Sequence, residues 1–169
     1  DRSPSRGLGD VYKRQLLALV AIDELPLDRR ITATLDDASV EGSAVGIGPD
    51  GTYTVEQLLE GLLMASGNDS AHALAQALGG DDVALKKVNE LAKKLGTRST
   101  VAASYHGLDA AGMSTSAADI SIIYRAAFSN ETFARIVDTE HVDFPGWKDL
   151  PGYELWNDCL LYTSDAADE

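Results

Sequence analysis

The hydrophobic positions in the first third of the chain predict one helix, one strand and an irregular ribbon. A short, almost wholly apolar run over residues 16–24 is long enough for a buried helical segment and ends at the turn around Pro26. Residues 30–35 alternate apolar and polar side chains, which is the period of a half-buried strand. The Gly-rich residues 42–51 then predict turns with short strands or an irregular ribbon.

The best-marked helix of the chain begins at Thr54, which can form a capping box with Gln57 three residues later. Its apolar side chains share one face: Val55, Leu58, Leu59, Leu62 and Leu63. The helix leads to a Ser-Gly-Asn tripeptide that begins at Ser66, and an Ala-rich helix is predicted over residues 70–78 before Gly79 and Gly80 end it. We therefore expect the tripeptide on a short turn between two packed helices.

Three further helices are predicted downstream. The first starts at Asp81 or Asp82 and is closed by Gly96, with an apolar face and four lysines expected to face solvent: Lys86, Lys87, Lys93 and Lys94. After a longer connection, Ser116 and Asp119 open a helix with inward positions at Ile120, Ile123, Tyr124 and Ala127. Asn130 caps a short helix to Val137, and the Pro- and Gly-containing segment after it predicts irregular chain or edge strands.

Composition narrows the classes of function. A chain of 169 residues with 44% hydrophobic content can bury one core, so it forms one domain or part of one. The net charge of −13 argues against a nucleic-acid partner, since the phosphate backbone selects basic surfaces. A single cysteine, Cys159, excludes an intrachain disulfide, and no apolar stretch reaches the length of a membrane span.

The two ends of the chain differ from its middle. Residues 1–15 lack a clear hydrophobic period, and both this segment and residues 159–169 resemble translated adapter sequence from sequencing reads. We interpret both ends as non-native, with an ordinary frayed terminus as the alternative. The native part is then expected to span residues 16–158.

The candidate chemistry lies at Ser66 and Asn68. A hydroxyl and a carboxamide two positions apart on a turn between packed helices can both face one substrate. Taken alone, the pattern is weak, because serine and asparagine are also common in turns and helix caps. Its significance depends on the sequence around it.

Three sequence blocks together carry a family resemblance. Residues 57–71, 106–119 and 150–157 resemble, in order and spacing, the serine-type D-Ala-D-Ala carboxypeptidases, which are low-molecular-mass penicillin-binding proteins. The resemblance covers residues 16–158 and implies the α+β fold shared by beta-lactamases and DD-peptidases. It identifies this chain as a helix-rich fragment of that fold with an incomplete antiparallel sheet.

The family's chemistry uses three elements, Ser-x-x-Lys, Ser-x-Asn and Lys-Thr-Gly, and this chain contains only the second. Aligned on the apolar run, Ser-x-x-Lys would fall on the segment from Val11 to Arg14, and Lys-Thr-Gly beyond Trp156. The resemblance gives Ser66 a catalytic role as a proton relay to the leaving amine and Asn68 a role in binding the substrate. Because the nucleophile and its lysine are missing, the fragment is expected to be inactive.

The resemblance also implies the partners of the intact parent enzyme. Its serine would attack the bond between two D-alanines at the end of a peptidoglycan stem peptide, forming an acyl-enzyme that water resolves. Beta-lactams would bind the same site, and no cofactor, metal or nucleic acid is implied. Because the stem peptide is assembled across the membrane, the parent is expected outside the cytoplasm, either secreted or attached to the membrane.

Several alternatives stay open at this stage. A class A beta-lactamase-like hydrolase would carry Ser-Asp-Asn, whereas Gly67 stands in the middle here, and a non-catalytic peptidoglycan-binding module would keep the cleft without the nucleophile. A triad of Ser66, His72 and Asp69 lacks any supporting local motif, and zinc binding by His72 and His106 lacks metal-ligand spacing. The Gly-rich stretch also lacks the pattern of a phosphate-binding loop.

Overall fold

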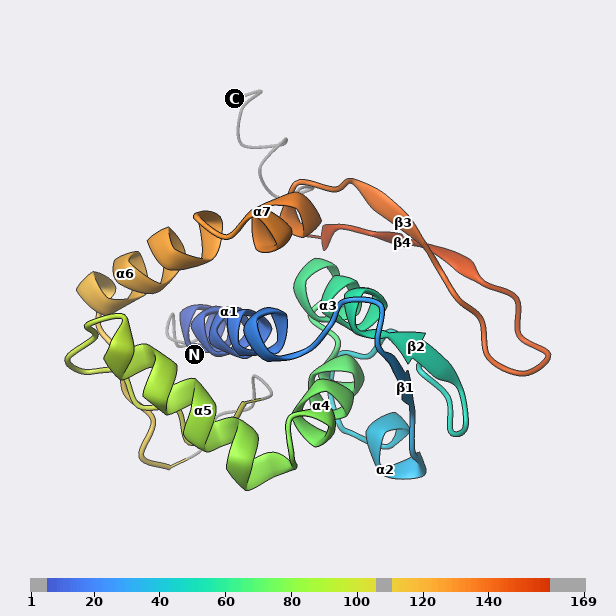
Figure 1. The fold of residues 1–169 in the computed structure, drawn as a ribbon, viewed down its shortest axis with the longest axis horizontal. Helices are drawn as coiled ribbons and strands as arrows, with labels where there is room; N and C mark the ends of the chain where they lie inside the picture. Colours follow the sequence, from blue (N-terminus) through green and yellow to red (C-terminus); the bar gives the residue numbers. More distant parts are fainter. Residues whose placement is uncertain (1–5, 106–110, 159–169) are drawn as a thin grey trace.

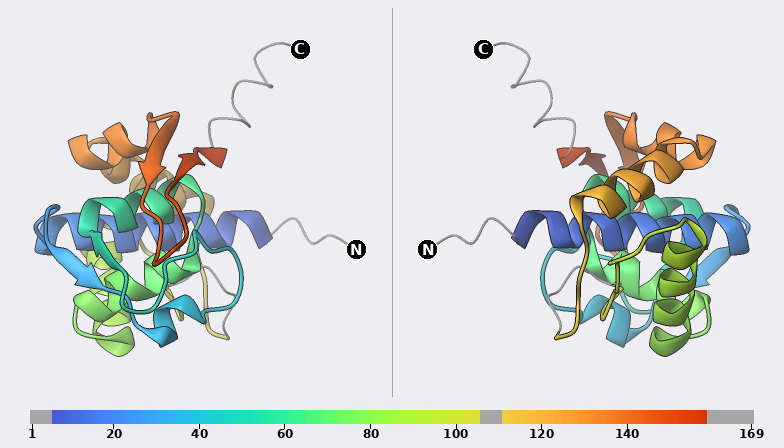
Figure 2. Two further views of the ribbon diagram at one scale, coloured as in Figure 1. Left: turned by 90° about the vertical axis from the view of Figure 1, so that its right-hand side faces the viewer. Right: turned by 90° about the vertical axis from the view of Figure 1, so that its left-hand side faces the viewer.

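A computed structural model describes residues 6–105 and 111–158 of the chain. Its elements in chain order are α1 (Arg6–Glu24), β1 (Arg30–Thr32), α2 (Leu35–Ala38), β2 (Thr52–Thr54), α3 (Val55–Met64), α4 (Asn68–Ala77), α5 (Asp81–Lys94), α6 (Ala117–Phe128), α7 (Glu131–Val137), β3 (His141–Phe144) and β4 (Tyr153–Trp156). Helices α3, α4, α5, α6 and α7 surround α1 and pack against it (Figure 1). The two side views show α1 running through the middle of the molecule (Figure 2).

Helix α1 is the centre of the hydrophobic core. Six consecutive apolar residues, from Leu16 to Ala21, are buried, so this stretch of α1 is enclosed on all sides by the other helices. The predicted start at residue 16 is wrong, because the helix begins at Arg6. Tyr12 lies one turn before Leu16 and is 1% exposed, but the neighbouring Lys13 and Gln15, both buried, interrupt the apolar pattern in the sequence.

The segment after α1 forms a short strand and a single helical turn. β1 pairs with β2 in antiparallel register, with Ile31 opposite Tyr53. The strand predicted over residues 30–35 is wrong beyond Thr32, because Thr34 and Asp37 form a capping box that starts α2. Leu35, predicted on the inward face of the strand, is consequently 67% exposed.

Helices α3, α4 and α5 follow the predicted pattern closely. The capping box between Thr54 and Gln57 is present at the start of α3, where the Thr54 hydroxyl accepts a hydrogen bond from the Gln57 amide. The α4 helix begins at Asn68, two residues before the predicted start, and places that side chain in its first turn. Of the four lysines predicted to face solvent on α5, Lys87 is only partly exposed, because it pairs with Glu24 of α1.

The last elements close the other side of α1. Ser116 and Asn130 cap α6 and α7 as predicted, and Ile123 and Ala127 of α6 are buried. The inward prediction for Tyr124 is wrong, because its ring is 36% exposed and stacks on that of Phe128. β3 and β4 form an antiparallel hairpin, so of the two predictions for the segment after Val137, irregular chain or edge strands, the edge strands are confirmed. The predicted helix-rich α+β class is confirmed, with the strands described here arranged as two separate two-stranded sheets.

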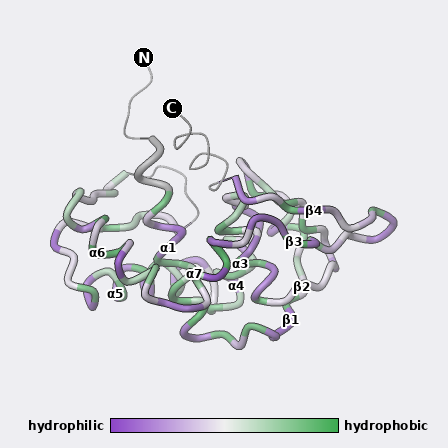
Figure 3. The backbone as a smooth tube through the Cα atoms, turned by 90° about the horizontal axis from the view of Figure 1, so that it is seen from above, coloured by the Kyte–Doolittle hydropathy of each residue, from purple (hydrophilic) through white to green (hydrophobic). Residues whose placement is uncertain are grey.

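Hydrophobic and hydrophilic positions alternate along the surrounding helices (Figure 3). None of the helices in the described ranges combines the length and the apolar character needed to cross a lipid bilayer. His106, weighed as a zinc ligand, and the single cysteine, Cys159, lie outside the described residues.

Candidate active site

The turn between α3 and α4 holds the Ser-Gly-Asn tripeptide in a constrained conformation. Ser66 has a φ of +56°, in the left-handed region that non-glycine residues rarely adopt. The turn is closed by a 2.9 Å hydrogen bond from the Gly67 amide to the Gly61 carbonyl. Left-handed backbone of this kind costs about 1–2 kcal/mol and is concentrated at functional sites, where the surroundings enforce it.

Close packing explains why the middle residue of the tripeptide is glycine. A Cβ atom at Gly67 would lie 2.8 Å from Oδ1 of Asp69, 3.1 Å from the Gly61 carbonyl oxygen and 3.2 Å from Cγ1 of Val45. An aspartate at this position would also bring a second carboxylate beside Asp69. The turn therefore does not accommodate the Ser-Asp-Asn form found in class A beta-lactamases.

Asn68 is 2% exposed and its carboxamide is held at both ends. Nη2 of Arg14 donates to Oδ1 at 3.0 Å, and Nδ2 donates to the Glu41 carbonyl at 2.8 Å. Because a guanidinium can only donate and a carbonyl can only accept, these two partners fix which way the amide faces. The carboxamide oxygen is thus turned toward residue 14 of α1.

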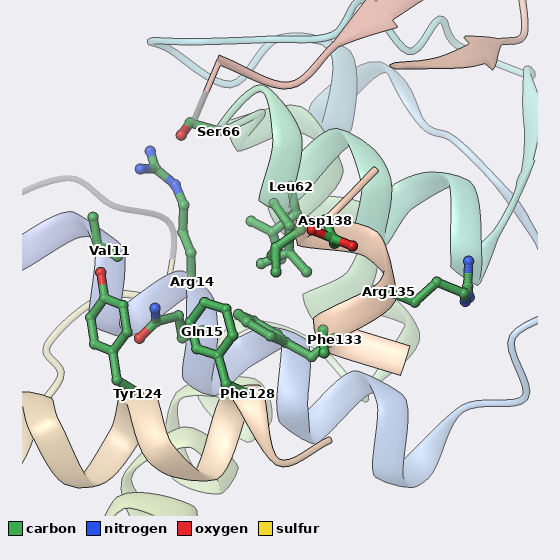
Figure 4. Close-up of a pocket in the computed structure, with 13 residues that line it drawn as sticks. Val11, Arg14, Gln15, Leu62, Ser66, Tyr124, Phe128, Phe133, Arg135 and Asp138 are labelled. Atoms are coloured by element: carbon green, nitrogen blue, oxygen red, sulfur yellow. The ribbon is translucent and has the colours of Figure 1, made fainter. Parts of the chain in front are cut away.

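Ser66 and Arg14 both line a pocket of about 730 Å³ between α1, α3, α6 and α7. In the close-up view, the Ser66 hydroxyl and the Arg14 guanidinium lie at the same end of this pocket (Figure 4). The other lining residues are mainly apolar and include Val11, Leu62, Leu63, Tyr124, Phe128, Phe133 and Val137. Of the positions where the family's Ser-x-x-Lys would fall, position 14 therefore contacts Asn68, and position 11 lines the same pocket as Ser66.

The side chains at these two α1 positions cannot perform the family's first step. Val11 has no nucleophilic atom, and the guanidinium of Arg14 stays protonated at any pH a protein tolerates, so it cannot serve as a general base. Only the Ser-x-Asn component of the site is present in a chemically competent form.

The hypothetical triad of Ser66, His72 and Asp69 does not form. Nδ1 of His72 lies 2.5 Å from Oδ1 of Asp37, a buried residue of α2. Both carboxylate oxygens of Asp69 instead accept hydrogen bonds from backbone amides of residues 45–47. Within the described ranges, no group of three or more His, Cys, Asp or Glu side chains is placed to hold a metal ion.

Sequence reasoning missed Asp69 and its contact with the Gly-rich segment. The signal available was an acidic residue in the first turn of α4, directly after the tripeptide, but such residues commonly stabilise a helix N-terminus without other partners. The contact joins residues more than twenty positions apart, so no local pattern reveals it.

The chain matches the D-alanyl-D-alanine carboxypeptidase family over residues 15–157. It is 46% identical over 132 residues to D-alanyl-D-alanine carboxypeptidase DacB2 of Mycobacterium tuberculosis, an alignment that covers 77% of this chain and 45% of that protein. It is 30% identical over 127 residues to the carboxypeptidase DacF of Bacillus subtilis, covering 73% of this chain and 33% of that one. The chain thus spans less than half the length of these two relatives.

Solved structures of such enzymes also resemble this chain in fold. The crystal structure of a D-alanyl-D-alanine carboxypeptidase from Mycobacterium tuberculosis superposes with a TM-score of 0.82 at 41% identity, over 87% of this chain and 56% of that one. A variant of the Streptomyces K15 DD-transpeptidase gives a TM-score of 0.81 at 25% identity, over 90% of this chain and 65% of that one. By sequence and by fold, this chain belongs to the D-alanyl-D-alanine carboxypeptidase family.

Proposed function

We propose that this chain is the Ser-x-Asn half of a serine-type D-Ala-D-Ala carboxypeptidase that removes the terminal D-alanine from peptidoglycan stem peptides. The observation that carries the proposal is the meeting of Ser66, Asn68 and residue 14 at one end of a pocket, from two segments far apart in the sequence. An enzyme with this substrate would act outside the cytoplasm, facing the cell wall.

In the proposed parent enzyme, a serine at position 11 attacks the carbonyl between the two D-alanines and a lysine at position 14 takes its proton. The hydroxyl of Ser66, both donor and acceptor, passes a proton to the leaving D-alanine. The contact between Oδ1 of Asn68 and residue 14 indicates that the asparagine also orients the lysine, in addition to binding the stem peptide. Of the two hydrogens on Nδ2 of Asn68, one is donated to the Glu41 carbonyl.

A chimera tests this proposal. Residues 15–157 of this chain replace the matching segment of the Mycobacterium tuberculosis DacB2, which supplies everything before and after them. The chimera is expected to release D-alanine from a peptide ending in D-Ala-D-Ala. Ser66→Ala and Asn68→Ala should each lower kcat/KM by about 100-fold or more, as expected for groups that act on the reacting atoms.

Ser121→Ala is the matched control, because this serine is exposed on α6, outside the pocket, and its hydroxyl bonds only to its own helix. It should leave the rate of release unchanged. Full activity in the Ser66→Ala chimera would contradict the proposed role of Ser66. A folded chimera that binds stem peptide without releasing D-alanine would instead favour a non-catalytic peptidoglycan-binding module.

A further inference from the structure

The carboxylate of Asp69 holds one specific stretch of backbone. Asp69 is 1% exposed, and its Oδ1 accepts hydrogen bonds from the amides of Val45 at 3.1 Å and Ser70 at 2.8 Å. Its Oδ2 accepts from the amides of Gly46 at 2.8 Å and Ile47 at 3.1 Å. Three consecutive amides of an irregular segment are thus tied to the first turn of α4.

The residue before it holds the other part of the same segment. The Asn68 amide donates to the Ser43 carbonyl at 2.7 Å, and the Asn68 side chain donates to the Glu41 carbonyl at 2.8 Å. From the opposite side, the Tyr153 hydroxyl donates to the Val45 carbonyl at 2.6 Å. Residues 41–47, which we call the anchored segment, are therefore fixed along their length.

We propose that Asp69 is a positioning residue for Asn68. The Glu41 carbonyl helps to orient the Asn68 carboxamide, and Asp69 holds residues 45–47 of the anchored segment to which this carbonyl belongs. Loss of this anchor loosens the Glu41 contact, which is one of the two that hold the carboxamide, so its oxygen is turned less firmly toward residue 14. The consequence for catalysis rests on the function proposed above, whereas the geometric effect does not.

An amide cannot replace this carboxylate. In Asp69→Asn, one of the two acceptor oxygens becomes an NH2 group that can only donate. That group then faces either the amides of Val45 and Ser70 or those of Gly46 and Ile47, and the pair it faces loses its acceptor. The isosteric change therefore releases part of the anchored segment while it preserves side-chain volume.

The first test is independent of activity and uses the 169-residue chain. The side-chain amide signals of Asn68 are identified in a ¹⁵N-labelled sample by their loss in Asn68→Ala. In Asp69→Asn, these signals should move toward the position of a solvent-exposed asparagine and exchange faster with water. If the Asn68 signals of Asp69→Asn have the same positions as in the unsubstituted 169-residue chain, the positioning role is refuted.

Asp119→Asn is the matched control. Asp119 is 3% exposed, lies in the first turn of α6 and also accepts backbone amides, from Arg98 at 3.0 Å and Ser99 at 2.7 Å. It shares the chemistry of Asp69 but is not part of the site. Asp119→Asn should leave the Asn68 signals in place, and an equal displacement in both variants would reduce the effect to general destabilisation and overturn the proposal.

A second variant covers the case in which Asp69→Asn does not fold. Gly46 has a φ of +80° and open space around its Cβ position, so Gly46→Ala strains the anchored segment without touching Asn68. Gly96, with a φ of +92° and equally open surroundings, is its control at the end of α5. Gly46→Ala should displace the Asn68 signals and Gly96→Ala should not, and the reverse result contradicts the proposal.

The catalytic consequence is measured in the chimera. Asp69→Asn should lower kcat/KM by about tenfold, because a misplaced orienting group costs alignment of the scissile bond. In the Asn68→Ala background, the same change should cost less than about twofold, since the two residues act as one unit. Full additivity of the two losses would overturn the positioning role. A chimera with no activity at all would count against the proposed function, while the amide signals still decide the role of Asp69.

Discussion

Gly67 shows how a single missing side chain determines the shape of this site. A methyl group there would press against Asp69, Gly61 and Val45, all of which are held by hydrogen bonds or core packing. Gly67→Ala should therefore lower the free energy of unfolding by about 1–3 kcal/mol, the usual cost of overpacking. Gly67→Asp should cost more, because it adds a like charge beside Asp69. Chemical denaturation measures both, and a Gly67→Asp chain as stable as the original would contradict this packing.

Glu60 gives the chain a predictable pH dependence. Burial on α3, with a smaller contribution from the nearby Glu56, raises the pKa of its carboxyl from 4.5 to about 7, although Arg135 opposes the shift. The folded state thus binds this proton more tightly than the unfolded state. The stabilising effect of the protonated form is present below pH 4.5 and is lost as the pH rises toward 7.

Glu60→Gln should remove this contribution, so that the free energy of unfolding falls less between pH 5 and 8. At pH 8 the variant should be more stable than the original chain by about 1 kcal/mol, because solvent screens a partly exposed carboxylate and reduces the full effect. Urea unfolding at a series of pH values measures the slope. Ser121→Ala, at an exposed position on α6, should leave it unchanged, and an unchanged slope in Glu60→Gln would refute the assignment.

At the scale of elements, the capping box of α3 is a local feature with a measurable effect. The Thr54 hydroxyl accepts from the Gln57 amide at 3.1 Å, and the Gln57 side chain accepts from the Thr54 amide at 2.9 Å. Thr54→Ala should lower the free energy of unfolding by about 1 kcal/mol, as at other N-caps. Thr54→Ser keeps the acceptor and should lose much less. Equal losses in the two variants would show that packing, not capping, is responsible.

Elements with local start signals could be predicted from the sequence. Thr54, Ser116 and Asn130 each cap the helix that was expected to follow them, because a cap depends only on residues three positions away. The capping box at Thr34 is not predicted, because the alternating residues around it favour a strand. The start of α1 was missed because Lys13 and Gln15 are buried polar residues that mask the helical period.

The candidate site was only partly accessible to sequence reasoning. The turn between two helices follows from the pattern around Ser66, and the roles of Ser66 and Asn68 come from the family resemblance. Their proximity to residue 14 depends on how α1 packs against the ends of α3 and α4, which no local pattern specifies. The same holds for Asp69, whose partners lie in a segment without regular secondary structure.

At the scale of the whole molecule, the pocket beside the site leaves apolar rings accessible to solvent. Phe128 is 53% exposed and Tyr124 is 36% exposed, and their stacked rings line the pocket together with Phe133. A contiguous patch of exposed apolar side chains is a typical binding site for apolar ligands. The 169-residue chain should therefore enhance the fluorescence of anilinonaphthalene sulfonate.

Phe128→Ser should reduce this enhancement by about half or more, because it removes the most exposed ring of the pocket. Leu150→Ser is the control, since Leu150 is 64% exposed but lies outside the pocket. An equal reduction in both variants would show that the dye binds to scattered apolar side chains and not to the pocket.

The central claim is that the turn carrying Ser66 and Asn68 completes the cleft of a penicillin-recognising carboxypeptidase once a serine and a lysine occupy positions 11 and 14. Covalent labelling by a fluorescent penicillin tests it most directly, in the chimera and in the 169-residue chain side by side. The chimera should become labelled and the 169-residue chain should not, because Val11 offers no nucleophile. A labelled 169-residue chain, or a folded chimera that takes up no label, would contradict the account.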